Sequence, residues 1–299
     1  MTPETTPEVT PEATLEPIEF PGPGAYTLRG NVGRFERVYR VYIPDSYTGE
    51  SDPVPLLFVF HGAGGTGSGI ASISAFHELA DQEGFIAVFP DGINTIWDDG
   101  RPPDPNIGLV DDLAFVAGMV ETLTRSLNID TTRIYAAGYS AGGMFSYRLG
   151  CELPDIFAAV ASVASTFPEY LVNNCDDKPP KPVLIIQGTD DMVIPWVGIR
   201  GGYLSAAASL EYWGDHNGCA SATAILPQDD ADSEDDTLIL VQTRTDCDDD
   251  ADVLLYGIFF GGHTWPGHPI DAPFELGATS MDMDATQVIW DFFVAHPNR

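Results

Sequence analysis

A serine flanked by glycines ends an apolar run in the middle of the chain. The run at 134–139 leads directly into Ser140, and Gly138-Tyr139-Ser140-Ala141-Gly142 fits the pattern G-x-S-x-G. In this pattern the serine occupies a strained turn between a strand and a helix, where small neighbours leave room for the backbone. Ser140 is therefore a candidate nucleophile. The same residues also fit a glycine-rich helix start that the serine only caps.

A carboxylate and an imidazole follow two later apolar runs. Asp191 comes just after the run at 182–187, and His263 comes just after the run at 253–260. Serine attacks well only when a base takes its proton, so we assign His263 as the base and Asp191 as the acid that orients it. The order serine, aspartate, histidine, each just past a strand, is that of α/β-hydrolases. Alternatives for the acid and the base are Asp190, His216 and His268.

A second glycine-rich loop is suited to binding a developing oxyanion. The apolar run at 55–60 ends in His61-Gly62-Ala63-Gly64-Gly65. The tetrahedral intermediate of acyl transfer needs preorganised hydrogen-bond donors. We expect these to be the backbone N–H groups of Ala63 and of Ala141, the residue after the nucleophile. His61 stands before the loop and is expected to be structural.

Buried strands and helices alternate along the chain, and this alternation predicts the fold class. Continuous apolar runs are typical of strands covered on both faces of a parallel sheet, and they lie at 55–60, 85–90, 134–139, 157–165, 182–187 and 253–260. Helices are expected at about 72–82, from 111, from Ser140 to about 149, and at 283–295, with edge strands at 34–43. The pattern specifies an α/β fold with a mostly parallel sheet covered by helices on both faces. Working residues gather at the carboxyl ends of such strands, so the three candidates should meet there.

The charge balance limits the partners. The chain has 299 residues with 45 acidic against 13 basic residues, a net charge of −32. Such a field repels phosphate backbones, so we expect no nucleic-acid partner. No apolar run approaches the roughly 20 residues that a transmembrane helix needs.

The first residues differ in composition from the rest of the chain. Residues 1–24 repeat Thr, Pro and Glu with almost nothing to bury, which predicts a disordered tether to a cell surface or another module, followed by one catalytic domain at 25–299. The start also lacks the basic and apolar regions of a signal peptide. The chain is then either cytoplasmic or a mature secreted form from which a signal peptide has been removed, and disulfides between its cysteines would favour the secreted form that we expect.

The cysteines and the acidic clusters raise the question of metals. The four cysteines are Cys151, Cys175, Cys219 and Cys247; they lack C-x-x-C spacing, so two disulfides are favoured over zinc, with three connectivities open and four buried thiols as the alternative. The acidic stretch at 228–236 could bind calcium, but it lacks the EF-hand glycine and final ligand, and a solvated acidic turn is favoured. We expect no metal and no cofactor.

Four aromatic residues are candidates for a substrate pocket. Trp265 follows the base, and Tyr139, Trp97 and Trp196 lie on neighbouring loops. Aromatic walls suit an aryl or flat acyl group, although any of these rings could be ordinary core. There is no lipase-like lid insertion, which favours an open cleft and substrates attached to polymers.

The motifs together resemble a known family. The resemblance rests on His61-Gly62-Ala63-Gly64-Gly65, Gly138-Tyr139-Ser140-Ala141-Gly142-Gly143-Met144, Gly188-Thr189-Asp190-Asp191-Met192-Val193-Ile194-Pro195 and Gly261-Gly262-His263-Thr264-Trp265-Pro266-Gly267. These look like the secreted polyhydroxybutyrate depolymerase and feruloyl esterase family, carbohydrate esterase family 1, over residues 25–299. The resemblance implies an α/β-hydrolase fold, the triad named above, and a disulfide matching Cys219 and Cys247. Departures are the acidic stretch and Gln187, where the family often has histidine.

The resemblance implies a secreted serine esterase. It would act through an acyl-enzyme on feruloyl or acetyl esters of plant polysaccharide, and a polyester depolymerase is the alternative. A peptidase is disfavoured because no propeller-like domain precedes the catalytic part. A non-catalytic carbohydrate-binding or surface protein on the same scaffold is the alternative from another class.

Overall fold

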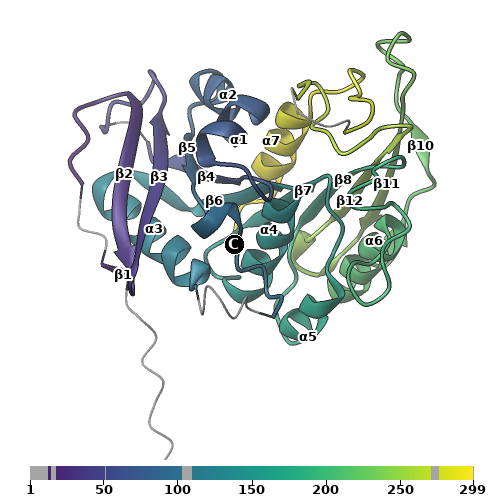
Figure 1. Ribbon diagram of the computed structural model, residues 1–299, viewed down its shortest axis with the longest axis horizontal. Coiled ribbons are helices and arrows are strands. Elements are labelled where there is room, and N and C mark those ends of the chain that lie inside the picture. Colours follow the sequence, from purple (N-terminus) through teal and green to yellow (C-terminus); the bar gives the residue numbers. More distant parts are fainter. Residues whose placement is uncertain (1–12, 15–17, 51, 103–109, 271–275, 299) are drawn as a thin grey trace, which may run out of the picture.

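A single twisted sheet runs through the structure. The computed structural model describes residues 13–14, 18–50, 52–102, 110–270 and 276–298. Within them the sheet has 12 strands in the order β1-β2-β3-β5-β4-β6-β7-β8-β12-β11-β10, with β9 also paired to β11 (Figure 1). The strands are β1 (Ala13–Thr14), β2 (Gly24–Val32), β3 (Phe35–Ile43), β4 (Val54–Phe60), β5 (Ile86–Pro90), β6 (Ile129–Tyr139), β7 (Ala159–Val163), β8 (Val183–Gly188), β9 (Ser221–Ala222), β10 (Leu226–Pro227), β11 (Leu238–Thr245) and β12 (Val253–Phe259).

The centre of the sheet is parallel and its edges are antiparallel. Strands β5, β4, β6, β7, β8 and β12 pair in parallel, whereas β2, β3 and β11 pair antiparallel with their neighbours. The central strands are the continuous apolar runs of the sequence, because both of their faces are covered. Strand β2 instead alternates between half-buried and exposed residues, as an edge strand does. The predicted fold class is therefore confirmed.

Helices cover both faces of the sheet (Figure 1). They are α1 (Gly67–Ser74), α2 (Phe76–Glu83), α3 (Asp112–Ser126), α4 (Ala141–Glu152), α5 (Val172–Cys175), α6 (Ala206–His216) and α7 (Ala285–Ala295). Buried residues of α1, α2 and α7 share one apolar core with the sheet, and those of α3, α4 and α6 share the other. The helix expected at 72–82 is two helices, because Ala75 takes a left-handed conformation (φ 49°) and breaks the run. Within the described residues, no helix combines the length and apolarity needed to cross a membrane.

Described residues near the start of the chain contact the sheet and α3. Ala13–Thr14 pair with the end of β2, and the Ile18 N–H donates to Ser126 Oγ at 3.1 Å. Residues 1–12 and 15–17 of the expected tether lie outside the described residues. These contacts put part of the segment expected to be a free tether against β2 and α3.

Two disulfides hold the loops between the later elements. Cys151 bonds to Cys175, joining the end of α4 to α5, and Cys219 bonds to Cys247, joining the segment after α6 to the turn after β11. All four cysteines are used. The expectation of two disulfides is confirmed, with the sequence-local connectivity.

Candidate active site

Ser140 lies on a strained turn between β6 and α4. Its backbone has φ 54° and ψ −119°, a conformation that residues other than glycine rarely adopt. A Cβ on Gly138 would lie 2.1 Å from the carbonyl of Gly142, and one on Gly142 would lie 2.2 Å from the Phe60 carbonyl oxygen. Both positions therefore require glycine. Ser140 precedes α4 but its side chain makes no capping hydrogen bond, so helix capping does not account for this serine.

The carboxylate of Asp191 binds the imidazole of His263. The His263 Nδ1 and Asp191 Oδ2 atoms are 2.7 Å apart, and both side chains are buried. The other carboxylate oxygen, Oδ1, accepts the N–H groups of Val193 and Ile194, each at 2.8 Å. A carboxylate with this many donors is held in place. Since Nδ1 donates to Asp191, Nε2 of His263 is left to act as a base.

The loops that carry the nucleophile and the base are joined directly. The Tyr139 hydroxyl donates to the His263 carbonyl oxygen at 2.6 Å, and the two rings lie 5.0 Å apart. The backbone of His263 is also fixed by its N–H bond to the Leu276 carbonyl at 2.6 Å. The residue before Ser140 thus contacts the residue that we assign as its base.

The alternatives for acid and base lie apart from this pair. Asp190 is exposed and accepts from Thr189 Oγ1 at 3.1 Å. His268 bonds to Asp284 at 3.2 Å, and His216 lies 3.4 Å from the Pro179 carbonyl oxygen. None of these contacts involves His263, so the geometry favours Asp191 as its partner.

The glycine-rich loop after β4 packs against the nucleophile. A Cβ on Gly62 would lie 3.3 Å from Ser140 Cβ, so the loop backbone runs alongside the serine. Ala141 is the first residue of α4, where backbone N–H groups have no partner within the helix. Ala63 follows Gly62 and is exposed. The two expected oxyanion donors therefore belong to the residue after Ser140 and to the loop that packs against Ser140.

His61 fixes the peptide that presents Ala63. Its Nε2 accepts the Gly92 N–H at 3.0 Å, so the ring proton is on Nδ1, which lies 2.8 Å from the Gly62 carbonyl oxygen. That oxygen also accepts the Gly65 N–H at 3.0 Å. Burial lowers the pKa of His61, which keeps the ring neutral. Holding the Gly62 carbonyl orients the N–H of Ala63, because both belong to one rigid peptide plane.

The aromatic residues expected to form a pocket wall are mostly committed to the core. Trp97 is buried, donates from Nε1 to the His61 carbonyl at 2.9 Å and stacks on Phe145. Trp265 is fully buried and donates from Nε1 to Thr286 Oγ1 at 3.0 Å. This burial is at odds with a pocket-wall role for these two rings, and it arises because each indole N–H finds its partner inside.

The remaining two aromatic candidates also pack internally. Tyr139 is buried and bonded to His263, as described above. Trp196 is half-buried, and a Cβ on Gly257 would meet its ring at 2.9 Å, so it lies against β12. These rings support the loops around the triad.

Gln187, a departure from the family pattern in the sequence, places a buried amide beside Asp191. Gln187 is fully buried near the end of β8, and its Nε2 donates to Asp191 Oδ2 at 3.0 Å. The sequence does carry a signal, because Gln187 is polar within the apolar run of β8. A buried polar residue inside a core strand needs a partner, which here is Asp191, the candidate acid.

The acidic stretch packs on the segment that supports the base. Asp282 Oδ1 accepts the N–H groups of Ala231 and Asp232 at 2.7 and 2.9 Å, and Asp235 Oδ2 accepts the Met281 N–H at 2.6 Å. Slight burial favours the neutral form of Asp235, but backbone donors outweigh it and lower its pKa. Among the described residues no cluster of three metal-ligating side chains is found.

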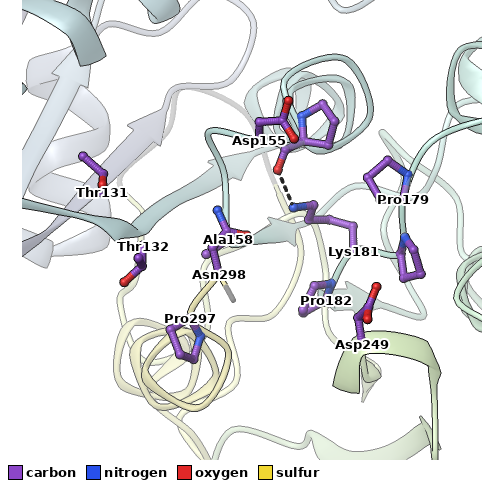
Figure 2. Close-up of a pocket in the computed structure, with 12 residues that line it drawn as sticks. Thr131, Thr132, Asp155, Ala158, Pro179, Lys181, Pro182, Asp249, Pro297 and Asn298 are labelled. Carbon is purple, nitrogen blue, oxygen red and sulfur yellow. Dashed lines mark hydrogen bonds between the residues drawn. The ribbon is translucent and has the colours of Figure 1, made fainter.

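A separate cavity of about 450 Å³ lies at the opposite edge of the sheet. Its lining includes Lys181, Pro182 and Ala158, which precede or begin parallel strands, whereas Ser140 follows one. Figure 2 shows the Lys181 ammonium directed at the backbone of the neighbouring loop, where it donates to the Pro154 carbonyl at 2.9 Å. Burial lowers the pKa of Lys181 to about 8. This cavity does not contain the candidate catalytic residues.

The chain is similar to several named esterases. No family model matches it. Feruloyl esterase C of Emericella nidulans is 29% identical over 92% of this chain and 91% of that protein. Feruloyl esterase B of Piromyces equi is 32% identical over 60% of this chain, which spans only 35% of that protein's length.

A solved structure supports the fold. The acetyl xylan esterase from Aspergillus awamori matches with a TM-score of 0.55 at 16% identity, covering 91% of this chain and 99% of that one. This likeness concerns the α/β-hydrolase fold, and the named relatives concern the activity. The chain is therefore a carboxylic ester hydrolase of the α/β-hydrolase fold, and it is similar in sequence to proteins named as feruloyl esterases.

Proposed function

We propose that this protein is a secreted serine esterase that works through an acyl-enzyme. The observation that carries the proposal is the 2.7 Å bond between Asp191 and His263 next to a serine on a strained turn. Asp191 fixes the imidazole so that Nε2 faces the reaction, and Ser140 supplies the nucleophile. Secretion is supported by the two disulfides, which form in oxidising compartments.

The proposed reaction has two steps. His263 takes the proton of Ser140 Oγ as that oxygen attacks the ester carbonyl, and it returns the proton to the departing alcohol. Water then attacks the acyl-enzyme with His263 again as base, which releases the acid and restores Ser140. The N–H groups of Ala63 and Ala141 would stabilise both oxyanions, and losing one such donor typically costs about 2.7 to 4 kcal/mol.

The proposed substrates are feruloyl or acetyl esters of plant polysaccharide. Relatives named as feruloyl esterases and the acetyl xylan esterase fold neighbour support this class. Methyl ferulate and acetylated xylan are the first substrates to compare. Ser140→Ala should abolish hydrolysis of both while the near-ultraviolet circular dichroism stays that of the wild type.

A fluorophosphonate probe separates this proposal from a non-catalytic role. It should label the wild type and leave Ser140→Ala unlabelled, because only an activated serine reacts. Full ester hydrolysis by Ser140→Ala, or a wild type that neither reacts with the probe nor cleaves any ester, would refute a serine esterase.

A polyester is the second candidate substrate, favoured by exposed apolar side chains beside the triad. Met192 is 88% exposed and follows Asp191, Val197 is 79% exposed, and Phe260 is 57% exposed three residues before His263. Phe260 also has a φ of 61°, which is strained for a bulky residue. Apolar groups at a site mouth, within a surface of net charge −32, suit a neutral apolar polymer.

Serine substitutions at these three positions test the polyester. Met192→Ser, Val197→Ser and Phe260→Ser together should slow hydrolysis of a polyester film several-fold while p-nitrophenyl butyrate is cleaved as before. Val294→Ser on α7 is the matched control, because Val294 is 55% exposed and lines a cavity beside the start of β4 whose lining lacks the three proposed catalytic residues. Equal losses on the film and the soluble ester would count against a polymer-contacting role.

A further inference from the structure

A neutral amide shares the oxygen through which the acid holds the base. Asp191 Oδ2 accepts from His263 Nδ1 at 2.7 Å and from Gln187 Nε2 at 3.0 Å. The second proton of the same amide goes to the Ile194 carbonyl oxygen at 2.8 Å. Gln187 therefore binds both the carboxylate and the far end of the turn that carries it.

The orientation of this amide follows from its neighbours. All three groups facing Nε2 are acceptors, namely the Asp191 carboxylate, the Ile194 carbonyl and, at 3.4 Å, the Gly188 carbonyl, so a rotated amide would place Oε1 against three oxygens. As oriented, Oε1 is buried without a hydrogen-bond partner among the described residues. An unsatisfied buried oxygen is unfavourable. Val183 and Ile185 on the same face of β8 are apolar. Position 187 therefore keeps a polar side chain at a cost in stability, where an apolar one would fit the pattern of the strand.

We infer that Gln187 is a positioning residue of the proposed triad, a donor without charge that fixes Asp191 toward His263. The inference rests on the proposed role of Asp191 and His263. An amide does not titrate, so Gln187 itself keeps its donor as the medium is acidified. Losing a hydrogen bond to a charged group at this point lets the carboxylate rotate away from Nδ1 and weakens the base.

Two substitutions test this role through kcat and through the pH profile. Gln187→Met removes the donor at similar size and should lower kcat by about 10- to 100-fold with little change in KM, as expected for a hydrogen bond to a charged group. Gln187→Glu keeps the shape but sets a second carboxyl against Asp191. Two neighbouring carboxyls share a proton at low pH and repel when both ionise. Activity relative to the wild type should therefore fall as the pH rises, which moves the optimum toward acid.

Asn217 provides a matched control. It is a fully buried amide that donates to the Lys181 and Ala251 carbonyls, each at 2.7 Å, and none of its hydrogen bonds involves a triad residue. Asn217→Leu should lower the melting temperature and leave kcat and the pH profile unchanged. If Gln187→Met fails to fold, Gln187→Glu at low pH, where the shared proton restores a donor, still reports on the role.

The outcomes separate this inference from the proposed function. Hydrolysis that does not depend on Ser140 refutes the proposed function. Hydrolysis that depends on Ser140, with a kcat for Gln187→Met within twofold of wild type or an unshifted pH profile for Gln187→Glu, refutes only the positioning role.

Discussion

The hydroxyl of Tyr139 donates a 2.6 Å hydrogen bond to the carbonyl oxygen of His263, 124 residues further along the chain. Tyr139 is the last residue of β6, so the same residue that leads into the Ser140 turn also holds the loop of the base. The bond is buried, and it joins backbone on one side to a rigid ring on the other. It therefore fixes the spacing of two catalytic segments without touching a reacting atom.

Removing this hydroxyl should affect turnover more than stability. Tyr139→Phe is expected to lower kcat about 10-fold or more, because the His263 loop loses a fixed contact and small misplacements of catalytic groups are costly. Tyr135→Phe on the same strand is the control, since the Tyr135 hydroxyl is buried without a hydrogen-bond partner among the described residues. Its loss should leave kcat unchanged and stability equal or higher. Equal kcat values for the two variants would contradict a role for the Tyr139 bond.

Acid should destabilise the fold partly through His61. Burial lowers the pKa of His61 in the folded state, whereas the unfolded chain titrates near the ordinary value of about 6.5. Below that value the unfolded state binds a proton that the folded state excludes, so this stability is lost as the pH falls through the folded pKa. His61→Gln cannot titrate and should flatten the free energy of unfolding against pH below about 6.5. Urea unfolding at several pH values between about 5 and 8 measures how the free energy of unfolding changes with pH in the wild type and in His61→Gln. Parallel curves for the two proteins would exclude this contribution of His61.

The ion pair of Arg37 and Asp112 should be costly to break. Both side chains are fully buried, with Arg37 Nη2 2.6 Å from Asp112 Oδ1 and the guanidinium 3.9 Å from the Phe115 ring centroid. Arg37→Leu leaves a buried carboxylate alone, which typically costs about 3 to 5 kcal/mol. Burial already raises the pKa of Asp112, so the loss should shrink in acid as the carboxyl becomes neutral.

An exposed ion pair supplies the comparison for Arg37. Arg29 pairs with Glu36 on the surface, where both side chains are more than half exposed. Arg29→Leu should change the free energy of unfolding by less than about 1 kcal/mol. Chemical denaturation at neutral pH measures the free energy of unfolding of both variants. Similar losses for Arg37→Leu and Arg29→Leu would show that burial does not determine what breaking the ion pair costs.

Dilute salt should raise the melting temperature. The net charge of −32 makes the carboxylates repel one another in the compact state. The screening length falls from about 30 Å at 0.01 M to about 8 Å at 0.15 M, so most of the gain should appear over that range. Differential scanning calorimetry at several sodium chloride concentrations measures it. A melting temperature that stays constant over this range would mean that the charges are too far apart to strain the fold.

The sequence predicted the centre of the sheet because burial on both faces leaves a plain pattern. Strands β4, β5, β7, β8 and β12 and the second half of β6 match the continuous apolar runs, and the loops after β6, β8 and β12 carry Ser140, Asp191 and His263. The Asp191 to His263 contact follows from this topology. Asp191 and His263 follow the neighbouring strands β8 and β12, as the carboxyl-end rule expects.

The parts that the sequence did not predict depend on tertiary neighbours. Strand β11 carries charged and polar residues among its apolar ones, and its pairing with β12 supplies the partner that the pattern cannot reveal. The break at Ala75 has no glycine or proline to mark it. Trp97 and Trp265 were expected near substrate, but their burial is set by residues far along the chain, such as Thr286.

The strained backbone at Ser140 makes this position a conflict between folding and chemistry. A glycine would relax a backbone conformation that costs of order 1 to 3 kcal/mol, and only part of that gain would be lost to the greater freedom of glycine in the unfolded chain. Selection for thermal stability alone would therefore favour replacing the nucleophile. A screen for thermostable variants of this protein must therefore measure turnover as well as melting temperature. Ranking by melting temperature alone selects variants in which Ser140 has been replaced.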